Sequence, residues 1–255
     1  MRIINKIVEV CCGSYYDCLQ AYKGKANRVE LNSALYMGGL TPSIASLVLT
    51  KKNTNLKVIC MVRPRGAGFC YEKQDYETMV LDVKSMLERG ADGIAFGCLN
   101  DKGNINISQT KKIIDIIKSY GKEKEVVFHR AFDCVSDPYE TMRSLIKLGV
   151  DRILTSGLED KAVQGVALLK DLQKEFGDKV QILAGSGINA KNVKQFMEDT
   201  KITQVHSSCK SWLKDNTTTK NNISYAYTND DFAYEIVDTK LVKQLVEIVN
   251  KQERK

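Results

Sequence analysis

The stretch "ERGADGIAF", residues 88–96, joins the end of a helix-like segment to a short apolar run. Before it, apolar residues recur at spacings of three and four over 75–88, which predicts an amphipathic helix. Gly90 then ends this helix, because glycine readily adopts the left-handed conformation that follows many helix C-termini. The run "GIAF" at 93–96 predicts a buried strand. The stretch therefore indicates a helix that leads through a tight turn into a strand.

The same cadence recurs along the chain, for example in "KLGVDR" at 147–152. Eight short apolar runs are predicted strands: 6–10, 28–31, 57–62, 93–96, 125–129, 152–156, 180–184 and 204–207. Helical patterns lie between them, and "SDPYET" at 136–141 predicts a helix start with Asp137 as N-cap and Pro138 in the first turn. The last helix is expected over 238–250. Eight strands, each followed by a helix, predict an α/β fold of the (β/α)8 TIM-barrel type, with an open doubly wound sheet as the alternative.

A chain of 255 residues without a Pro/Gly/Ser-rich linker is expected to form a single domain, 1–255. One segment departs from the βα pattern. Residues 210–236 follow the eighth strand and are too polar and too long for an ordinary βα loop. A lid, a subunit contact and a mobile surface excursion all remain open for this segment.

Composition excludes several classes of protein. The net charge of +7 comes from lysines spread over helical faces, without the clustered basic stripe that nucleic-acid binding needs. The N-terminal residues lack a signal-peptide pattern and no stretch is apolar for long enough to span a bilayer, so we expect a cytoplasmic protein with no membrane partner. The eight cysteines are scattered over a long chain, which favours free thiols over a disulfide framework.

Active sites of such barrels lie at the C-terminal ends of the strands, so polar residues at those ends are the candidates. They are Glu9, Cys11, Glu30, Arg63, Arg65, His129, Arg130, Asp133, Ser156, Gly185, Gly187, His206 and Ser208. A lone histidine at a strand end is more often structural, but both histidines of this chain fall at the predicted mouth, which favours a functional site. In the alternative, the acids and arginines are satisfied ion pairs that cap the barrel core.

Two further patterns bear on the ligand. "AGSGINAKN" at 184–192 resembles the seventh-strand loop of phosphate-binding barrels, although a short Gly-x-Gly also serves as a tight turn. No His or Cys pair has the spacing of a zinc finger or a zincin. Soft thiolates favour Cu(I), but Cys11 and Cys12 should point to opposite faces of a strand and cannot easily share one ion.

Seven blocks in order carry a family resemblance over nearly the whole chain: "EVCCGSYYDC", "NRVELNSALYMGGLTPS", "MVRPRGAGFCY", "GADGIAFGCLNDKGNIN", "FHRAFD", "DRILTSG" and "VHSS". Together they resemble the CutC family, which is named for copper homeostasis. The resemblance implies a (β/α)8 barrel, a cytosolic location, a role in copper tolerance or copper(I) binding, and a homo-oligomer.

The resemblance also implies site residues. Its polar cluster matches Glu9, Cys11, Glu30, Arg63, Arg65, His129, Arg130, Asp133, Ser156, His206 and Ser208. The chain departs from the family pattern where many members have a cysteine directly after "VEL", because Asn32 stands there. Further departures are Gly68 in place of an aspartate and Cys209 in place of an alanine, and an arginine after the eighth strand corresponds loosely to Lys220.

Two functions are therefore expected. As a copper-binding protein, the chain would hold Cu(I) through Cys11 with another thiol or His206. As an enzyme, it would bind a small phosphorylated or carboxylated metabolite and use no organic cofactor. In the enzyme hypothesis, the catalytic candidates are Glu9, Glu30, His129, Asp133 and His206, and the binding candidates are Arg63, Arg65, Arg130, Ser156, Gly185, Gly187 and Ser208.

Overall fold

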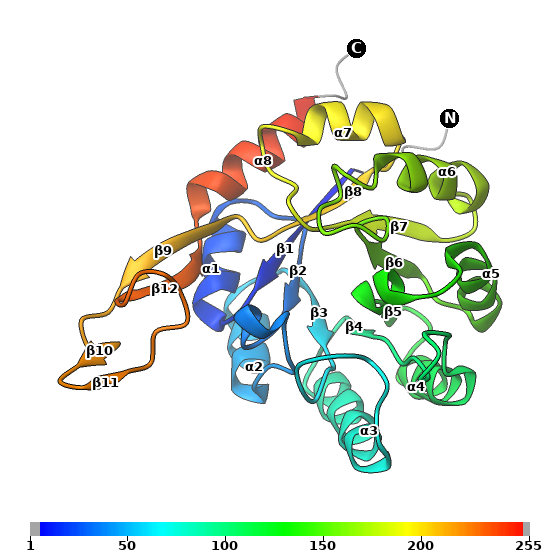
Figure 1. Cartoon of the computed structure of the whole chain (residues 1–255), viewed down its shortest axis with the longest axis horizontal. Helices are drawn as coiled ribbons and strands as arrows, with labels where there is room; N and C mark the ends of the chain where they lie inside the picture. The colour runs from blue at the N-terminus through cyan, green and yellow to red at the C-terminus, as the bar shows by residue number, and fades with distance from the viewer. Residues whose placement is uncertain (1–5, 252–255) are drawn as a thin grey trace.

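The structure is a computed structural model that describes residues 6–251, and it confirms the predicted barrel (Figure 1). The parallel strands are β1 (Ile7–Cys12), β2 (Arg28–Leu31), β3 (Lys57–Met61), β4 (Gly93–Phe96), β5 (Glu125–Phe128), β6 (Arg152–Thr155), β7 (Gln181–Ala184) and β8 (Gln204–Ser207). Each strand pairs with the next, and β8 pairs with β1, so the sheet closes on itself. This closure excludes the open doubly wound sheet.

A ring of helices surrounds the strands. They are α1 (Tyr15–Lys23), α2 (Ile44–Asn53), α3 (Lys73–Glu88), α4 (Ile107–Ser119), α5 (Pro138–Leu148), α6 (Val166–Phe176), α7 (Val193–Thr200) and α8 (Thr239–Lys251), with short 3₁₀ turns η1 (Leu35–Met37) and η2 (Arg130–Cys134). No helix among residues 6–251 combines the length and the apolarity needed to cross a bilayer.

Local sequence signals set the helix ends. Asp137 is the N-cap of α5, because its carboxylate accepts the amides of Tyr139 and Glu140 at 2.9 and 3.0 Å. Gly149 ends the same helix with a φ of +86°, and Gly90 follows α3 with a φ of +94°. Each of these glycines, which precede a strand in the sequence, therefore ends a helix in the fold, and the next barrel strand follows it.

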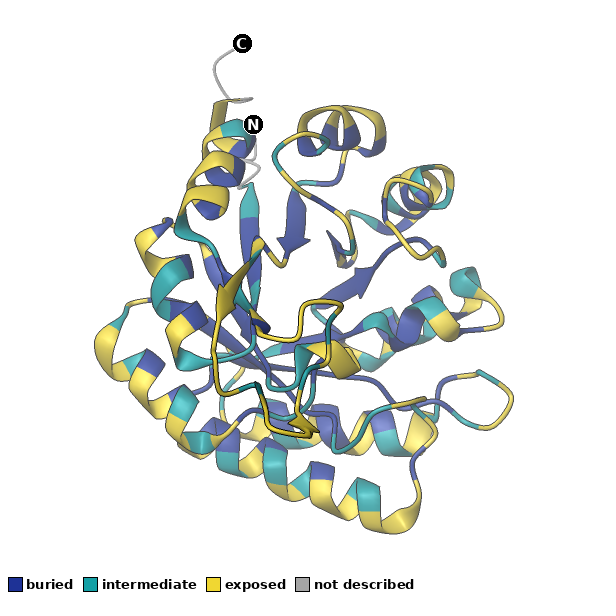
Figure 2. Ribbon diagram, turned by 60° about the vertical axis from the view of Figure 1, so that its left-hand side comes forward, coloured by how far each residue is buried: buried dark blue, intermediate teal, exposed yellow. Residues whose placement is uncertain are grey.

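The barrel has two cores. The larger one lies between the strands and the helices, and the strands are buried along most of their length (Figure 2). Inside the barrel, a small apolar cluster of Ile59, Met61, Ala95 and Val127 fills one part. Buried charged residues fill another part: Glu9, Arg28, Glu30 and Arg152 are each no more than 4% exposed. Buried charges need partners, and the partners of these four residues lie at the two ends of the barrel that are described below.

The polar segment 210–236 folds into an antiparallel arm. Its base is β9 (Lys210–Lys214) paired with β12 (Ala233–Val237), and its tip contains β10 (Thr219–Lys220) and β11 (Ile223–Ser224). The arm extends beside α1 and away from the barrel, and most of it is exposed (Figures 1 and 2). Its base is fixed by Asp17 of α1, which accepts the Val237 amide at 2.8 Å.

Candidate functional site

A pocket of about 430 Å³ opens at the C-terminal end of the barrel. The pocket is lined by eight of the residues expected from the sequence: Cys11, Glu30, Arg63, His129, Arg130, Gly187, His206 and Ser208. They come from β1, β2 and β8 and from the segments after β3, β5, β7 and β8. The strand ends therefore bring residues from distant parts of the chain into one pocket, which we call the mouth pocket.

His206 is the centre of a buried cluster at one wall of this pocket. Its Nδ1 lies 2.8 Å from Oε1 of Glu9. Its Nε2 lies 4.0 Å from Oε2 of Glu30, and the ligand atoms of Cys11, Glu30 and His206 all lie within 4.8 Å of one another. Because Glu9 occupies Nδ1, the second ring nitrogen is left for the side facing Cys11 and Glu30.

Asn32 connects two members of the cluster. Its Nδ2 donates to Oε2 of Glu30 at 3.0 Å and lies 3.6 Å from Sγ of Cys11. The amide is 1% exposed, and its Oδ1 has no hydrogen-bond partner among residues 6–251. Asn32 thus stands beside the Cys11 thiol, where the family resemblance predicts a second cysteine in many members.

Burial and neighbouring charges set the protonation states. Burial alone would lower the pKa of His206, but hydrogen bonds to Cys11 and Glu9 and the charge of Glu30 outweigh it and raise that pKa well above 6.5. Burial also raises the pKa of Cys11 and of Glu30, the latter reinforced by the charge of Glu9. Arg28 and His206 overcome burial and hold the pKa of Glu9 well below its usual value. At neutral pH the cluster therefore contains an imidazolium, a carboxylate and a protonated thiol.

His129 has the opposite character. It is 2% exposed, and its Nδ1 accepts the Ala131 amide at 3.1 Å. Burial and the nearby charge of Arg63 lower its pKa to about 3, so the ring is neutral near pH 7 and carries its proton on Nε2. That Nε2–H has no partner among the described residues, and the ring packs against Phe69 with 5.0 Å between ring centroids. His129 is thus placed as a hydrogen-bond donor rather than as a general base.

The two arginines after β3 differ. Arg63 is 5% exposed and uses both terminal nitrogens to hold loop carbonyls, with Nη1 2.9 Å from Met37 O and 3.0 Å from Gly39 O, while its Nε remains unpartnered among residues 6–251. Arg65 does not line the mouth pocket. Its Nε donates to Asp75 of α3 at 2.7 Å. The expected pair of anion-binding arginines is therefore divided between the pocket and the outside of the barrel.

Asp133 organises the loop after β6 and does not bond to His129. Its carboxylate accepts the Ser156 amide at 3.0 and 3.1 Å and the Ser156 hydroxyl at 3.0 Å. It also receives Nε of Arg130 at 2.7 Å. Arg130 Nη2 donates in turn to the Ser156 hydroxyl at 2.8 Å. Asp133 and Ser156 lie behind the pocket wall, where they position the partly exposed Arg130.

The loop after β7 partly matches the expected phosphate loop. Ser186 and Gly187 both have left-handed backbones, with φ of +74° and +77°, and their amides donate to no acceptor among the described residues. Gly185 lies between β6 and β8, where a Cβ would stand 2.7 Å from Leu154 Cδ1 and 3.4 Å from His206 Cβ. The extra helix that completes many barrel phosphate sites is replaced here, because β9 begins at Lys210 directly after β8.

The residues that line the mouth pocket but were not among the sequence candidates include Phe69, Lys161 and Glu235. Lys161 lies in the long loop after β6, and a basic residue in such a loop was a usable signal. Phe69 stands six residues after Arg63 in the block that carries the resemblance. Glu235 belongs to the arm and pairs with Lys210 at 3.1 Å. Only the fold of the arm brings it to the mouth, so no local pattern could have indicated it.

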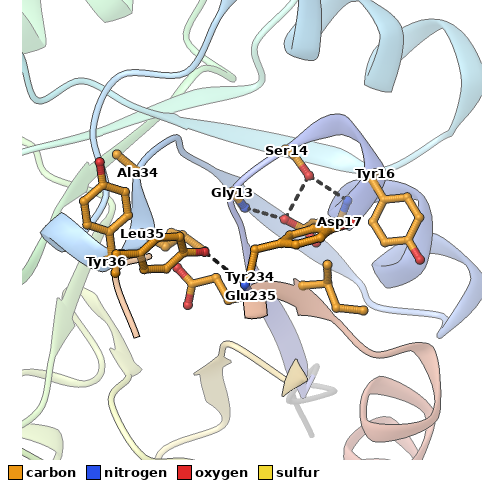
Figure 3. Close-up of a pocket in the computed structure, with 11 residues that line it drawn as sticks. Gly13, Ser14, Tyr16, Asp17, Ala34, Leu35, Tyr36, Tyr234 and Glu235 are labelled. Atoms are coloured by element: carbon orange, nitrogen blue, oxygen red, sulfur yellow. Dashed lines mark hydrogen bonds between the residues drawn. The ribbon is translucent and has the colours of Figure 1, made fainter. Parts of the chain in front are cut away.

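A second hollow of about 380 Å³ lies next to the mouth, between the arm and α1 (Figure 3). Four tyrosines line it, Tyr16, Tyr36, Tyr227 and Tyr234, and the rings of Tyr36 and Tyr227 stack at 4.7 Å. The two hollows share Leu35 and Glu235 in their walls. The arm thus extends the mouth pocket toward an aromatic recess.

Comparison with known proteins gives the family. The sequence profile of the CutC family matches residues 6–211. A CutC family protein of Treponema denticola is 44% identical over 202 residues, covering 79% of this chain and 80% of the relative. The copper homeostasis protein cutC homolog of Homo sapiens is 35% identical over 205 residues, covering 80% of this chain and 74% of the relative.

A solved structure of a similarly named protein also resembles this chain. The putative copper homeostasis protein CutC from Streptococcus agalactiae is similar with a TM-score of 0.72 at 26% identity, covering 80% of this chain and 98% of that one. The matched profile ends at the base of the arm, so it contains every strand of the barrel. The chain belongs to the CutC family.

Proposed function

We propose that this protein binds Cu(I) at the mouth of the barrel, with Cys11 Sγ and His206 Nε2 as the ligands. One observation carries the proposal: the donor atoms of Cys11, Glu30 and His206 lie within 4.8 Å of one another. Copper is the substrate or cargo of such a site. The homeostasis role named for the human and Streptococcus agalactiae relatives supports the same metal.

The donor set suits a soft monovalent ion. A thiolate and an imidazole are ligands that Cu(I) accepts, whereas a single carboxylate alone would favour harder ions. Glu9 fixes His206 through Nδ1, as carboxylates commonly do for metal-binding histidines, and this leaves Nε2 as the donor. Asn32 supplies an amide where a second thiol would stand, so the site offers one thiol among residues 6–251.

Binding is coupled to protons. Both ligands are protonated at neutral pH because the pKa values of Cys11 and His206 are raised. A metal ion must displace these protons, so apparent affinity should increase as pH rises. We also propose a cytoplasmic location, which the eight free cysteines support because free thiols persist in reducing compartments.

A competition assay with a chromophoric Cu(I) chelator tests the proposal. Cys11→Ser should lose Cu(I) retention, whereas Cys134→Ser and Cys60→Ser should keep it. Cys134 is an exposed thiol outside the pocket and Cys60 is a buried one, so they separate site binding from general thiol chemistry. Equal losses in all three variants would reject the mouth site.

A second candidate function is an enzyme that acts on a small anionic metabolite. Two buried donors favour it, since Nε2–H of His129 and Nε–H of Arg63 have no acceptor among residues 6–251 and both side chains line the mouth pocket. Arg130 and Lys161 add positive charge at the rim. Glu30 would act as the acid or base, because its pKa is raised from the usual carboxyl value in the direction of neutral pH.

Thermal-shift screening of phosphorylated and carboxylated metabolites tests this second function. Arg63→Lys keeps the charge but removes the planar fork of donors, so anion affinity should fall. His129→Asn should spare anion binding and remove any turnover, and it should also lower stability because the His129 ring accepts the Ala131 amide. A wild-type protein that no anion stabilises would exclude the enzyme and leave the copper proposal intact.

A further inference from the structure

The barrel has a second opening at its N-terminal end, of about 400 Å³. Seven of the residues that line it are the first residues of strands: Ile7, Arg28, Lys57, Glu125, Arg152, Gln181 and Gln204. The strand register places Arg28 opposite Lys57, and Arg152 opposite Gln181. The remaining strand, β4, begins with Gly93, which adds no side chain. We call this set of first residues the basal ring.

Positive charge exceeds negative charge in the basal ring. Arg28, Lys57 and Arg152 line the opening together with one carboxylate, Glu125. Arg28 is compensated from inside the barrel, where it pairs with Glu9. Lys57 and Arg152 share Glu125, with Arg152 Nη2 2.7 Å from its Oε2. One positive charge of the ring is therefore left without an acidic partner among these residues.

We assign this excess positive charge to Arg152. It is 1% exposed, and it donates through Nε and Nη2 to Gln181 and Gln204 at 3.1 to 3.2 Å. Its Nη1 has no acceptor among the described residues. Burial and the charge of Arg28 lower the pKa of Arg152, against the opposing charges of Glu9 and Glu125. An unpaired donor on a buried arginine is costly unless an acceptor is supplied.

Neutral amides in the basal ring leave its positive charge uncompensated. Gln204 Oε1 accepts from both Arg28 and Arg152, at 3.0 and 3.1 Å, and Gln204 Nε2 donates to Gln181 Oε1 at 2.7 Å. These amides satisfy hydrogen bonds without supplying charge. Arginine forks suit the oxygens of a phosphate group, which would accept several donors at once.

From these contacts we propose that the basal ring binds a small phosphate-class oxyanion, held by Arg152 and Lys57. The site lies at the opposite end of the barrel from the mouth pocket and shares no lining residue with it. Glu9 connects the two ends, because it pairs with Arg28 of the basal ring and with His206 of the mouth. Inorganic phosphate and the phosphate group of a small metabolite present the same chemistry to the ring.

Calorimetric titration of the full chain tests the site, with inorganic phosphate, glycerol 3-phosphate and chloride at matched ionic strength. Phosphate should bind and chloride should not. Gln181→Glu places a carboxylate where Arg152 already donates, so the variant should fold and lose phosphate affinity by at least about tenfold. Lys57→Gln should also weaken binding, and it removes only a half-exposed amine. If glycerol 3-phosphate binds more tightly than phosphate, the occupant is a metabolite.

Lys111→Gln is the matched control, because Lys111 is an exposed lysine that pairs with Asp115 and lines neither the basal ring nor the mouth pocket. This variant should bind phosphate as the wild type does. The proposal is overturned if the wild type does not bind phosphate, or if Lys111→Gln weakens binding as much as Gln181→Glu. Should Gln181→Glu fail to fold, the comparison of Lys57→Gln with Lys111→Gln decides in the same way.

Discussion

Glu9 Oε1 lies 2.8 Å from Nδ1 of His206, and the two residues are register partners on the neighbouring strands β1 and β8. The contact crosses the seam where the barrel closes. It fixes the imidazole so that Nε2 faces Cys11 and Glu30, and together with the hydrogen bond to Cys11 and the charge of Glu30 it raises the pKa of His206. The chemistry of the mouth therefore depends on a residue that lies below it, inside the barrel.

Asn32→Cys should strengthen Cu(I) binding. The amide nitrogen of Asn32 lies 3.6 Å from Sγ of Cys11, so a cysteine there would place two thiols side by side. Two soft ligands bind Cu(I) better than one, and we expect an increase in affinity of at least about tenfold. Chelator competition measures it. Asn32→Ser is the control, and a gain in that variant equal to the gain in Asn32→Cys would contradict the thiol argument.

Glu9→Gln should destabilise the protein and lower the pKa of His206. The substitution removes the partner of a buried arginine, Arg28, which typically costs on the order of 3–5 kcal/mol of unfolding free energy. Denaturant unfolding measures the loss, and proton NMR of the two histidines measures the pKa. Glu77→Gln breaks an exposed pair with Lys73 and should change stability by less than about 0.5 kcal/mol. Similar losses in both variants would refute this assignment.

The two histidines should give opposite slopes of stability against pH. The folded pKa of His129 is about 3, so its contribution is fully present above 6.5 and is lost as pH falls toward 3. The folded pKa of His206 is raised, so its contribution is fully present below 6.5 and is lost as pH rises through that folded value. Each slope reaches at most about 1.4 kcal/mol per pH unit.

Denaturant unfolding of wild type, His129→Asn and His206→Asn over a range of pH measures these slopes. His129→Asn should reduce the loss of unfolding free energy on the acid side. His206→Asn should reduce the loss on the alkaline side. Glu30 has a raised pKa and acts with the opposite sign to His129, and the charge of His206 lowers that pKa, so the curve of His206→Asn also contains a further rise in the pKa of Glu30. Parallel curves for the three proteins would show that neither pKa is shifted.

Alkylation should separate the cysteines by exposure. Cys70 and Cys134 are exposed, whereas burial raises the pKa of Cys11 and keeps its thiol protonated. At neutral pH, iodoacetamide should modify Cys70 and Cys134 first and Cys11 slowly. Peptide mass spectrometry identifies the order. Rapid labelling of Cys11 would mean that the thiolate form is favoured in the cluster, contrary to the proposed protonation state.

The strands could be predicted from the sequence almost to the residue, because runs such as 93–96 and 180–184 are mostly apolar segments bounded by turns. The site was predicted where a residue belongs to a strand or follows it directly, as Cys11 and His206 do, since strand geometry then fixes the direction of the side chain. Arg65 and Asp133 lie in loops, where partners such as Asp75 and Ser156 set the direction, and no periodic pattern encodes such partners.

The basal ring was missed for a different reason. Arg28 and Arg152 begin their strands, and the search for function was directed at strand ends. A charged residue that leads an apolar strand was a usable signal, because it must find a partner once the barrel closes. The single-domain organisation and the homo-oligomer stay predictions.

The interior contacts of Arg28, Arg152 and Gln204 also have a consequence for how the protein folds. These residues come from β2, β6 and β8, so a fragment that stopped after β4 or β5 would hold Arg28 without Gln204 and would lack the closing pair of β1 with β8. Its inward-facing charges would then lie in an unfinished and still hydrated sheet. Half-barrels cut from this chain should remain unfolded when expressed alone, and recovery of structure should require both halves together. We therefore expect the barrel to fold as a single cooperative unit, in which the last strand completes the pairing of Arg28 on the second.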